Sequence, residues 1–225
     1  MTRTALTFEV VGEDRRLTLD DVELVVGGYT GRDSDAVQHH IDELAAIGVP
    51  PPESIPAFYR LDPGLLTQSV QVQVQGANTS GEVEPLLIRH AGELFLSIGS
   101  DHTDRDMERA SVRDSKAACP KPVGTTAIAL GRIGRWDTIR LACEVDGVAY
   151  QRGSLDQLLN TVDVLESFLQ ENPVEGDLVL FGGTVPLIDG AFVPGTAWSM
   201  TLQIENGPEI DLHYDVTMSP DTRRA

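Results

Sequence analysis

Basic side chains are scarce in this chain. Lys and Arg number 17 against 35 Asp and Glu, which gives a formal net charge of −18. A surface that acidic repels phosphate backbones and anionic lipid, so we expect no nucleic-acid partner and no membrane role. Acidity alone favours solubility and names no partner.

Long apolar runs and cysteines are also scarce. No run approaches the roughly 20 apolar residues that a membrane helix needs. Met1–Thr4 leads into alternating residues instead of the apolar segment of a signal peptide. The two cysteines, Cys119 and Cys143, lack CxxC spacing, which favours reduced thiols. We therefore expect a soluble, cytoplasmic protein.

Strand patterns outnumber helix patterns along the 225 residues. Alternating or apolar segments bounded by turn residues predict strands at 5–11, 16–27, 69–75, 82–88, 93–98, 138–144, 148–152, 178–181, 198–204 and 209–216. Apolar residues at helical spacing predict helices at 33–48, 104–118 and 154–169. Because strands and helices do not alternate, we expect an α+β, strand-dominated fold in one domain, 1–225, with N-terminal strands in 1–27.

An acidic hairpin is the strongest chemical signal. Glu82 and Glu84 are two residues apart, so in a strand both carboxylates point to one face. Residues 93–98 can form the antiparallel partner, and the loop after them returns Asp101 to the two glutamates. Three converging carboxylates repel one another unless a cation lies between them, and a hard divalent cation is the usual solution. Two acids on a solvated strand face are the plain alternative.

Other residues suit a reaction. His40 borders the apolar stripe of the helix at 33–48 with Glu43 one turn away, as in an oriented general base, although a structural histidine also fits. Lys116 is by default a helix C-terminal lysine, and Arg105 by default pairs with a nearby acid. Gly183, before Thr184, suits a turn or a close backbone approach to a ligand.

The order of these motifs resembles the catalytic C-terminal domain of the fumarylacetoacetate hydrolase superfamily, most closely a bacterial branch of it. The resemblance covers residues 28–190. The segments that carry it are His40-Ile41-Asp42-Glu43, Pro56-Ala57-Phe58-Tyr59, Gly81-Glu82-Val83-Glu84, Gly99–Arg105, Ser115–Pro120, Tyr150–Ser154 and Glu175–Thr184. The chain departs from the family pattern at Ser100, where Asn is usual, and at Val185, which separates Thr184 from Pro186.

The resemblance implies a mixed β-roll and a homodimer. It also implies a divalent cation, Mg²⁺ first with Mn²⁺ or Ca²⁺ as alternatives, held by Glu82, Glu84 and Asp101. The substrate would be a small dicarboxylic or oxo acid, a 2-oxo or β-diketo acid whose C–C bond is hydrolysed through an enolate. In this scheme Lys116, Gly183 and Thr184 would bind the substrate's oxygens, and Arg105 would bind its carboxylate. His40, oriented by Glu43, would activate water. Decarboxylation, tautomerisation and non-catalytic binding of a small ligand or metal remain open alternatives.

Overall fold

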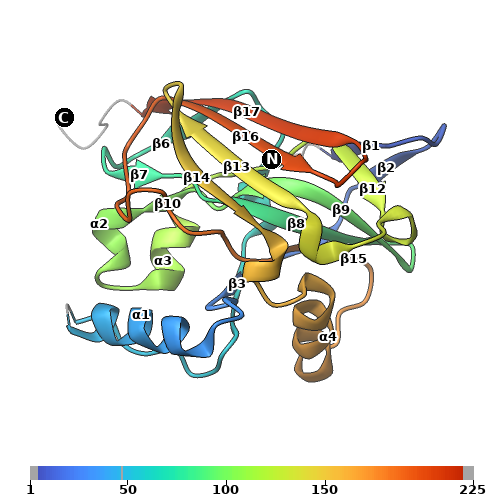
Figure 1. Ribbon diagram of the computed structural model, residues 1–225. Coiled ribbons are helices and arrows are strands. Elements are labelled where there is room, and N and C mark those ends of the chain that lie inside the picture. The colour runs from blue at the N-terminus through green and yellow to red at the C-terminus, as the bar shows by residue number, and fades with distance from the viewer. Residues whose placement is uncertain (1–4, 47, 220–225) are drawn as a thin grey trace.

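Two β-sheets form the body of the protein (Figure 1). The computed structural model describes residues 5–46 and 48–219. The eight-stranded sheet has the order β2-β1-β12-β9-β8-β15-β3-β4. Its strands are β1 (Leu6–Val10), β2 (Arg16–Leu19), β3 (Val22–Gly28), β4 (Ala57–Leu61), β8 (Val83–His90), β9 (Glu93–Ser100), β12 (Thr126–Ala129) and β15 (Asp177–Phe181).

The five-stranded sheet has the order β14-β13-β16-β17-β6. Its strands are β6 (Gln71–Val74), β13 (Arg140–Val145), β14 (Val148–Ser154), β16 (Ala197–Gln203) and β17 (Glu209–Met218). Two short pairs join β5 (Leu66–Thr67) to β11 (Lys121–Pro122) and β7 (Thr79–Ser80) to β10 (Thr103–Asp104). The strand-dominated α+β prediction is confirmed.

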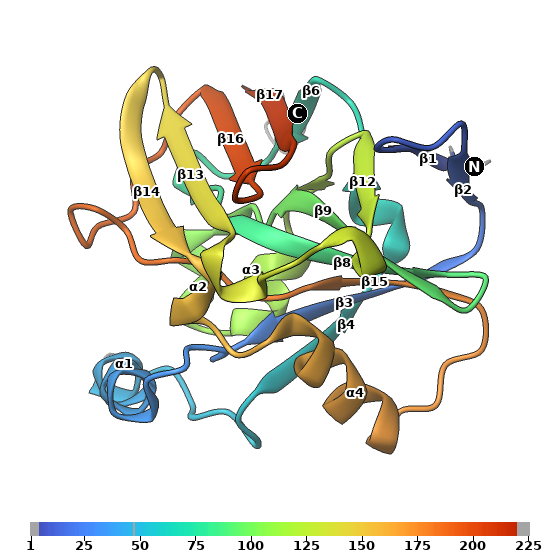
Figure 2. The ribbon, with the colours of Figure 1, turned by 45° about the vertical axis from the view of Figure 1, so that its right-hand side comes forward.

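Four α-helices among the described residues lie around the large sheet (Figures 1 and 2). They are α1 (Ser34–Ala46), α2 (Arg105–Glu108), α3 (Val112–Ala117) and α4 (Thr161–Glu171). Phe168 of α4 packs against the face of the sheet that carries Leu87, and Ala117 of α3 packs against the cluster on the other face. Short 3₁₀ turns are η1 (Pro63–Leu65), η2 (Leu130–Arg132), η3 (Trp136–Thr138) and η4 (Leu155–Gln157). No helix within 5–46 and 48–219 is long and apolar enough to cross a membrane.

Strand β8 is covered on both faces. Val83 belongs to the core between the two sheets, where Trp198 and Met200 of β16 also lie. Leu86 and Ile88, on the opposite face of the strand, pack in another cluster with Phe95 and Val179. Because both faces are buried, the strand carries the continuous apolar run 85–88 instead of strict alternation.

The predicted acidic hairpin is confirmed. β8 and β9 pair antiparallel, with Glu84 opposite Gly99, and turn through Ala91 and Gly92, both at positive φ. The N–H of Asp101 then donates to the carbonyl of Glu82 at 3.0 Å. This contact brings the loop back to the glutamates, as the sequence predicts.

Three predicted elements are divided in the structure. The strand expected at 16–27 becomes β2 and β3, which lie near opposite edges of the large sheet. The helix expected at 104–118 is broken into α2 and α3, each with its own capping side chain: Asp104 for α2 and Ser111 for α3. The helix expected from Ser154 begins with a capping box but stops at Gln157, and Asn160 caps a new helix, α4. In each case local caps and turns interrupt an apolar pattern that looked continuous.

The strand predicted at 69–75 is shorter than expected. Val72 and Val74 are buried in β6, as predicted. Val70, also expected to point inward, precedes the strand and is 70% exposed. That part of the prediction is wrong, since the alternation continues beyond the paired residues.

Candidate active site

Four neighbouring strands of the large sheet have their ends together on the same side of the molecule. β3 and β15 run parallel, β8 runs antiparallel to β15, and β9 runs antiparallel to β8. The C-terminal ends of β3, β15 and β9 therefore lie beside the N-terminal end of β8. A cavity of about 720 Å³ opens there, lined by residues from these ends and from α1, α3 and η4. Glu82, Glu84, Arg105, Lys116, Gly183, Thr184 and His40 all line it. Asp101 and Glu43 do not.

Asp101 lies behind the cavity wall, fully buried between two lysines. Its carboxylate forms an ion pair with Lys116 on one oxygen and with Lys121, at 3.0 Å, on the other. Burial would raise the pKa of the carboxyl, but the two ammonium groups outweigh burial and hold that pKa well below its ordinary value. Asp101 is therefore a carboxylate in this state.

The ammonium group of Lys116 lies among all three predicted acids. Burial lowers its pKa, but Asp101, Glu82 and Glu84 together hold the pKa above the ordinary lysine value. Lys116 is thus a cation at the place where the sequence predicts a divalent ion.

Glu84 is the acid with the weakest compensation. It is buried, and its carboxylate accepts the N–H of Gly183 at 2.8 Å. Burial and the nearby charge of Asp101 raise its pKa well above the ordinary value, although Lys116 acts in the other direction. A further positive charge here would favour the ionised carboxylate.

Gly183 reaches Glu84 because it lacks a side chain. Its φ is +94°, and a Cβ would lie 1.7 Å from the hydroxyl oxygen of Thr30. The hydroxyl of the next residue, Thr184, makes hydrogen bonds within the protein. It donates to the carbonyl of Val83 at 2.9 Å and accepts from the side-chain amide of Gln151 at 2.7 Å. These bonds fix the first residues of β8, and so the direction of Glu84.

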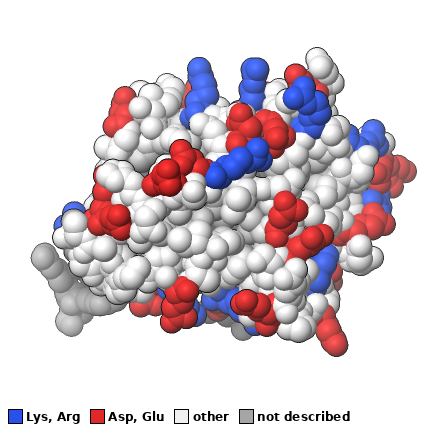
Figure 3. Space-filling view, turned by 60° about the horizontal axis from the view of Figure 1, so that its bottom comes forward, with Lys and Arg blue, Asp and Glu red and all other residues white. Residues whose placement is uncertain are grey.

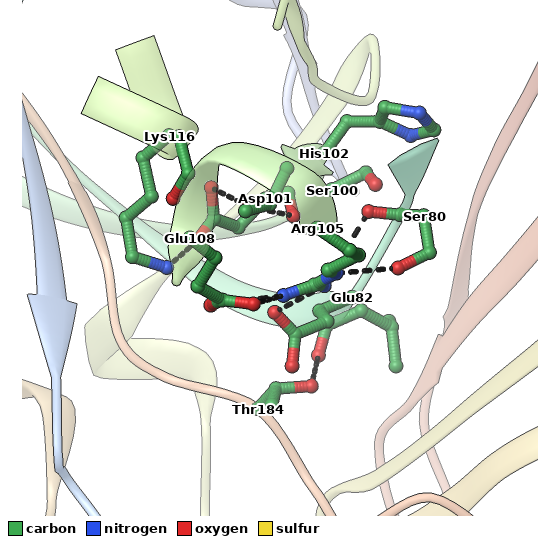
Figure 4. A network of polar contacts seen from close by, with 12 residues as sticks. Ser80, Glu82, Ser100, Asp101, His102, Arg105, Glu108, Lys116 and Thr184 are labelled. Atoms are coloured by element: carbon green, nitrogen blue, oxygen red, sulfur yellow. Dashed lines mark hydrogen bonds and ion pairs between the residues drawn. The ribbon is translucent and has the colours of Figure 1, made fainter. Parts of the chain in front are cut away.

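Arg105 is held by neighbouring side chains (Figure 4). Its guanidinium donates to the Ser80 hydroxyl at 2.7 Å, to Glu82 at 2.9 Å and to both oxygens of Glu108 at 3.0 and 3.1 Å. The Phe192 ring covers it, 3.5 Å from ring centroid to guanidinium carbon. Its expected contact with a substrate carboxylate stays a prediction, because these partners would have to give way.

The second residue of the predicted His–Glu pair points away from the cavity. His40 lines the cavity with its side chain 57% exposed, and its Nδ1 is 3.9 Å from Glu43. Glu43 is closer to His39, at 3.3 Å. The structure therefore confirms the helical phase of His40 but leaves its orientation by Glu43 as a prediction.

The sequence did not identify several important residues. Lys121 is fully buried and also donates to the carbonyl of His102 at 2.5 Å. Glu108, Tyr29 and Tyr59 line the cavity, and burial raises the pKa of Tyr59 to about 12, so its hydroxyl stays protonated. Lys121 lies five residues after Lys116 and between two prolines, and this position in the sequence was the feature that could have indicated a structural role.

The Asp101 loop has an unexpected support in place of the family's Asn. The Ser100 hydroxyl and the Tyr214 hydroxyl are 2.8 Å apart, and Tyr214 is also 3.0 Å from Nδ1 of His102. Nε2 of His102 contacts Thr79 at 3.0 Å. Burial, aided by Lys121 and Arg105, lowers the pKa of His102 to about 3. The neutral ring is a structural part of the loop.

The donor set suits a divalent cation in type and charge. In the state described here, no three His, Cys, Asp or Glu side chains among residues 5–46 and 48–219 are placed to hold one. The reason is visible in the geometry, since Asp101 is engaged by the two lysines. However, Glu82, Glu84 and Asp101 offer carboxylate oxygens near the Lys116 ammonium group, and hard cations prefer such ligands. The residues present therefore fit the ion that the sequence predicts.

Comparisons with known proteins agree with the fold. Residues 27–214 match the model of a family described as "Protein of unknown function (DUF2848)". A search of curated proteins found no match.

Solved structures are similar at low sequence identity. Fumarylpyruvate hydrolase from Pseudomonas aeruginosa, in complex with Mn²⁺ and pyruvate, is 18% identical with a TM-score of 0.67, covering 97% of each chain. A 5-carboxymethyl-2-hydroxymuconate delta-isomerase from Mycobacterium smegmatis is 16% identical with a TM-score of 0.63, covering 93% of this chain and 87% of that one. A protein from Yersinia pestis CO92, described as of the fumarylacetoacetate hydrolase family, is 14% identical with a TM-score of 0.61, covering 89% and 96%. At these identities the likeness shows the fold, and the predicted β-roll is confirmed.

Proposed function

The chain belongs to the family described as DUF2848 and has the fold of the fumarylacetoacetate hydrolase superfamily, and we propose that it is a metal-dependent enzyme that hydrolyses a C–C bond in a small 2-oxo or β-diketo acid. The observation that carries the proposal is the buried Lys116–Asp101 ion pair at a cavity that Glu82 and Glu84 also line and that is large enough for a small acid. A neighbour of this fold was crystallised with Mn²⁺ and pyruvate, which supports both parts.

The three acids would hold the cation, Mg²⁺ first with Mn²⁺ as the nearest substitute. When bound, a divalent cation would supply Lewis-acid stabilisation of the enolate that develops as the bond breaks. Lys116, released from Asp101 by the added charge, would donate to a substrate oxygen at the buried end of the cavity. Arg105 fixes the direction of the Glu82 carboxylate through a contact of 2.9 Å.

Hydrolysis of a 2,4-dioxo acid adds water across the bond between C3 and C4. His40, at the exposed end of the cavity, would take a proton from water as its oxygen attacks C4. C4 leaves as a carboxylic acid, and the electron pair of the broken bond stays with C3 as an enolate. The proton on His40 is then available to C3, which completes a 2-oxo acid. This sequence balances without any other reactant.

The proposal is tested with acylpyruvates and Mn²⁺. We expect turnover that falls at least about 100-fold in Glu82→Ala, with Mn²⁺ binding measured separately by electron paramagnetic resonance. Glu93→Ala is the matched control, since it removes an exposed carboxylate from the same hairpin. Unchanged turnover in Glu82→Ala would exclude the metal mechanism.

Decarboxylation or tautomerisation is the second candidate. It is favoured by one observation: Glu43 lies closer to His39 than to His40 and is 62% exposed, so no buried acid orients the proposed base. If water is not activated, an enolate can instead form by loss of CO₂ from a β-keto acid or by loss of a proton from a carbon next to a carbonyl group. Product analysis separates the cases, because only hydrolysis of an acylpyruvate releases a second carboxylic acid.

A further inference from the structure

Given the 2-oxo acid site proposed above, the rest of the cavity decides which 2-oxo acid fits. The buried end carries Glu84, Lys116 and Gly183. Away from it part of the wall is apolar, formed by side chains of α1, of the start of α3, of the turn after η4 and of the loop after β15. They are Val37, Leu44, Val112, Leu158 and Phe192. An apolar wall of this kind contacts hydrocarbon and offers a charged group nothing.

Each cation that lines the cavity within the described residues already has a carboxylate partner. Lys116 is paired with Asp101. Arg32 is paired with Asp137 through two contacts, at 2.8 and 3.4 Å, and its Nε donates to the carbonyl of Leu158 at 3.0 Å. Arg105 is paired with Glu82 and with Glu108. A second carboxylate on a ligand would therefore have to displace one of these partners.

Glu108 makes this displacement costly at Arg105. Both of its oxygens contact Nη1 of Arg105, and the two side chains are only 19% and 5% exposed. A carboxylate that took its place would leave the half-buried Glu108 side chain without its partner and beside a second acid, and separating such an ion pair is unfavourable. Glu108 also lines the cavity itself, together with Asp33 and Asp156, so the wall adds like charge to any second carboxylate.

We infer that the cavity selects 2-oxo acids with one carboxylate, at the keto end, and an uncharged apolar tail, and that Glu108 is the residue that sets this preference by keeping Arg105 from a second carboxylate. This specificity differs from that expected for dicarboxylic substrates. It places the chain's substrate among monoanionic oxo acids.

Binding is measured by calorimetry in saturating Mn²⁺, with no turnover required. The probes are 2-oxohexanoate and 2-oxoadipate, which share chain length and keto-acid head and differ by the terminal carboxylate. We expect 2-oxohexanoate to bind at least about tenfold more tightly. Glu108→Gln should reduce this ratio by about tenfold, mainly by tighter binding of 2-oxoadipate. Asp106→Asn is the matched control: it removes a charge from the same short helix, where Asp106 contacts Asn78 and not Arg105, and should leave the ratio unchanged.

The alternatives are distinct. Equal affinity for the two acids, or tighter binding of 2-oxoadipate, overturns the inference. If 2-oxoadipate binds more tightly and Arg32→Gln abolishes that advantage, Arg32 is the cation that binds the second carboxylate. A ratio that Glu108→Gln leaves unchanged overturns the role of Glu108. If neither acid binds, the 2-oxo acid site is itself wrong. Preferential binding without any turnover of acylpyruvates would instead contradict the hydrolase proposal alone.

Discussion

Lys121 shows how one residue can be decisive without lining the cavity. Its ammonium group is fully buried, and it contacts one oxygen of Asp101 while also donating to the carbonyls of Lys116 and His102. A buried cation needs this many partners to offset the loss of water. Lys121 therefore ties the Asp101 loop to the end of α3 and leaves Lys116 free to act on a ligand.

We expect substitutions of Lys121 and Lys116 to differ in their effects on stability and on turnover. Lys121→Met should lower the free energy of unfolding by about 3–5 kcal/mol, because it leaves one oxygen of Asp101 and the carbonyls of Lys116 and His102 without their buried donor. Lys116→Met should cost less stability, since Asp101 keeps Lys121, but should lower kcat at least about 100-fold. Urea unfolding and acylpyruvate turnover measure the two effects. Equal losses of stability in both variants would contradict this division of roles.

Cys119 predicts an alkaline dependence of stability. Burial raises the pKa of its thiol from 9.0 to about 11. Between these values the unfolded chain has lost the thiol proton and the native protein has kept it, so the free energy of unfolding falls as pH rises. The contribution is at most about 1.4 kcal/mol per pH unit. Urea unfolding from pH 8 to 11 should show a shallower decline in Cys119→Ala than in the unmodified chain; parallel curves would show that the thiol does not contribute.

At the scale of elements, α1 buries little of its surface in the core. Ile41 is its buried residue, whereas Val37 and Leu44, on the same stripe, line the cavity. The apolar stripe of α1 therefore serves the ligand site more than the sheet. In Figure 2 the helix lies away from the body of the sheets. Such an element is suited to move with ligand binding.

The phase of α1 gives a kinetic prediction. His40 lines the cavity, and His39, one residue earlier, is 76% exposed on another face. His40→Ala should therefore lower kcat by about 10²–10⁴-fold, the usual scale for a positioned base. His39→Ala is the matched control and should have little effect. Damage from His39→Ala alone would mean that the helix presents its other face in the working enzyme.

At the scale of the whole molecule, negative charge is spread over the surface. Figure 3 looks at the face that carries the helices, and acidic and basic side chains are dispersed there with no continuous basic area. Glu82, Glu84, Asp101 and Glu108 face only three cations at the site, Arg105, Lys116 and Lys121. A divalent ion would more than offset that excess of one negative charge, and because it would bind the native state and not the unfolded chain, its binding should stabilise the entire fold.

Thermal unfolding measures this stabilisation. Mn²⁺ at about 100 times its Kd should add about 2.7 kcal/mol, which corresponds to a rise in Tm of about 5–10 °C for a chain of this size. Glu84→Gln should remove most of the rise, while Glu93→Gln should retain it. NaCl at equal ionic strength controls for screening of the surface acids. A rise that survives in Glu84→Gln would place the ion elsewhere.

The local sequence determined the parts of the site that depend on short-range geometry. The two-residue spacing of Glu82 and Glu84, the hairpin that returns Asp101 to them and the phase of His40 all follow from the periods of strands and helices. The strand-dominated class follows from turn residues between short apolar segments. Motif order supplied the fold family and the choice of Lys116 and Thr184.

Only the tertiary structure decided how charges are shared. Three contacts illustrate this: Lys121 binds Asp101, Glu108 pairs with Arg105, and the Phe192 ring covers Arg105. None of these residues carries a sequence motif that would have predicted its partner. The divided elements have a local origin instead, since capping residues such as Ser111 and Asn160 interrupt an apolar pattern that continues through them. Local propensity sets which contacts are available, and packing sets which one each side chain makes.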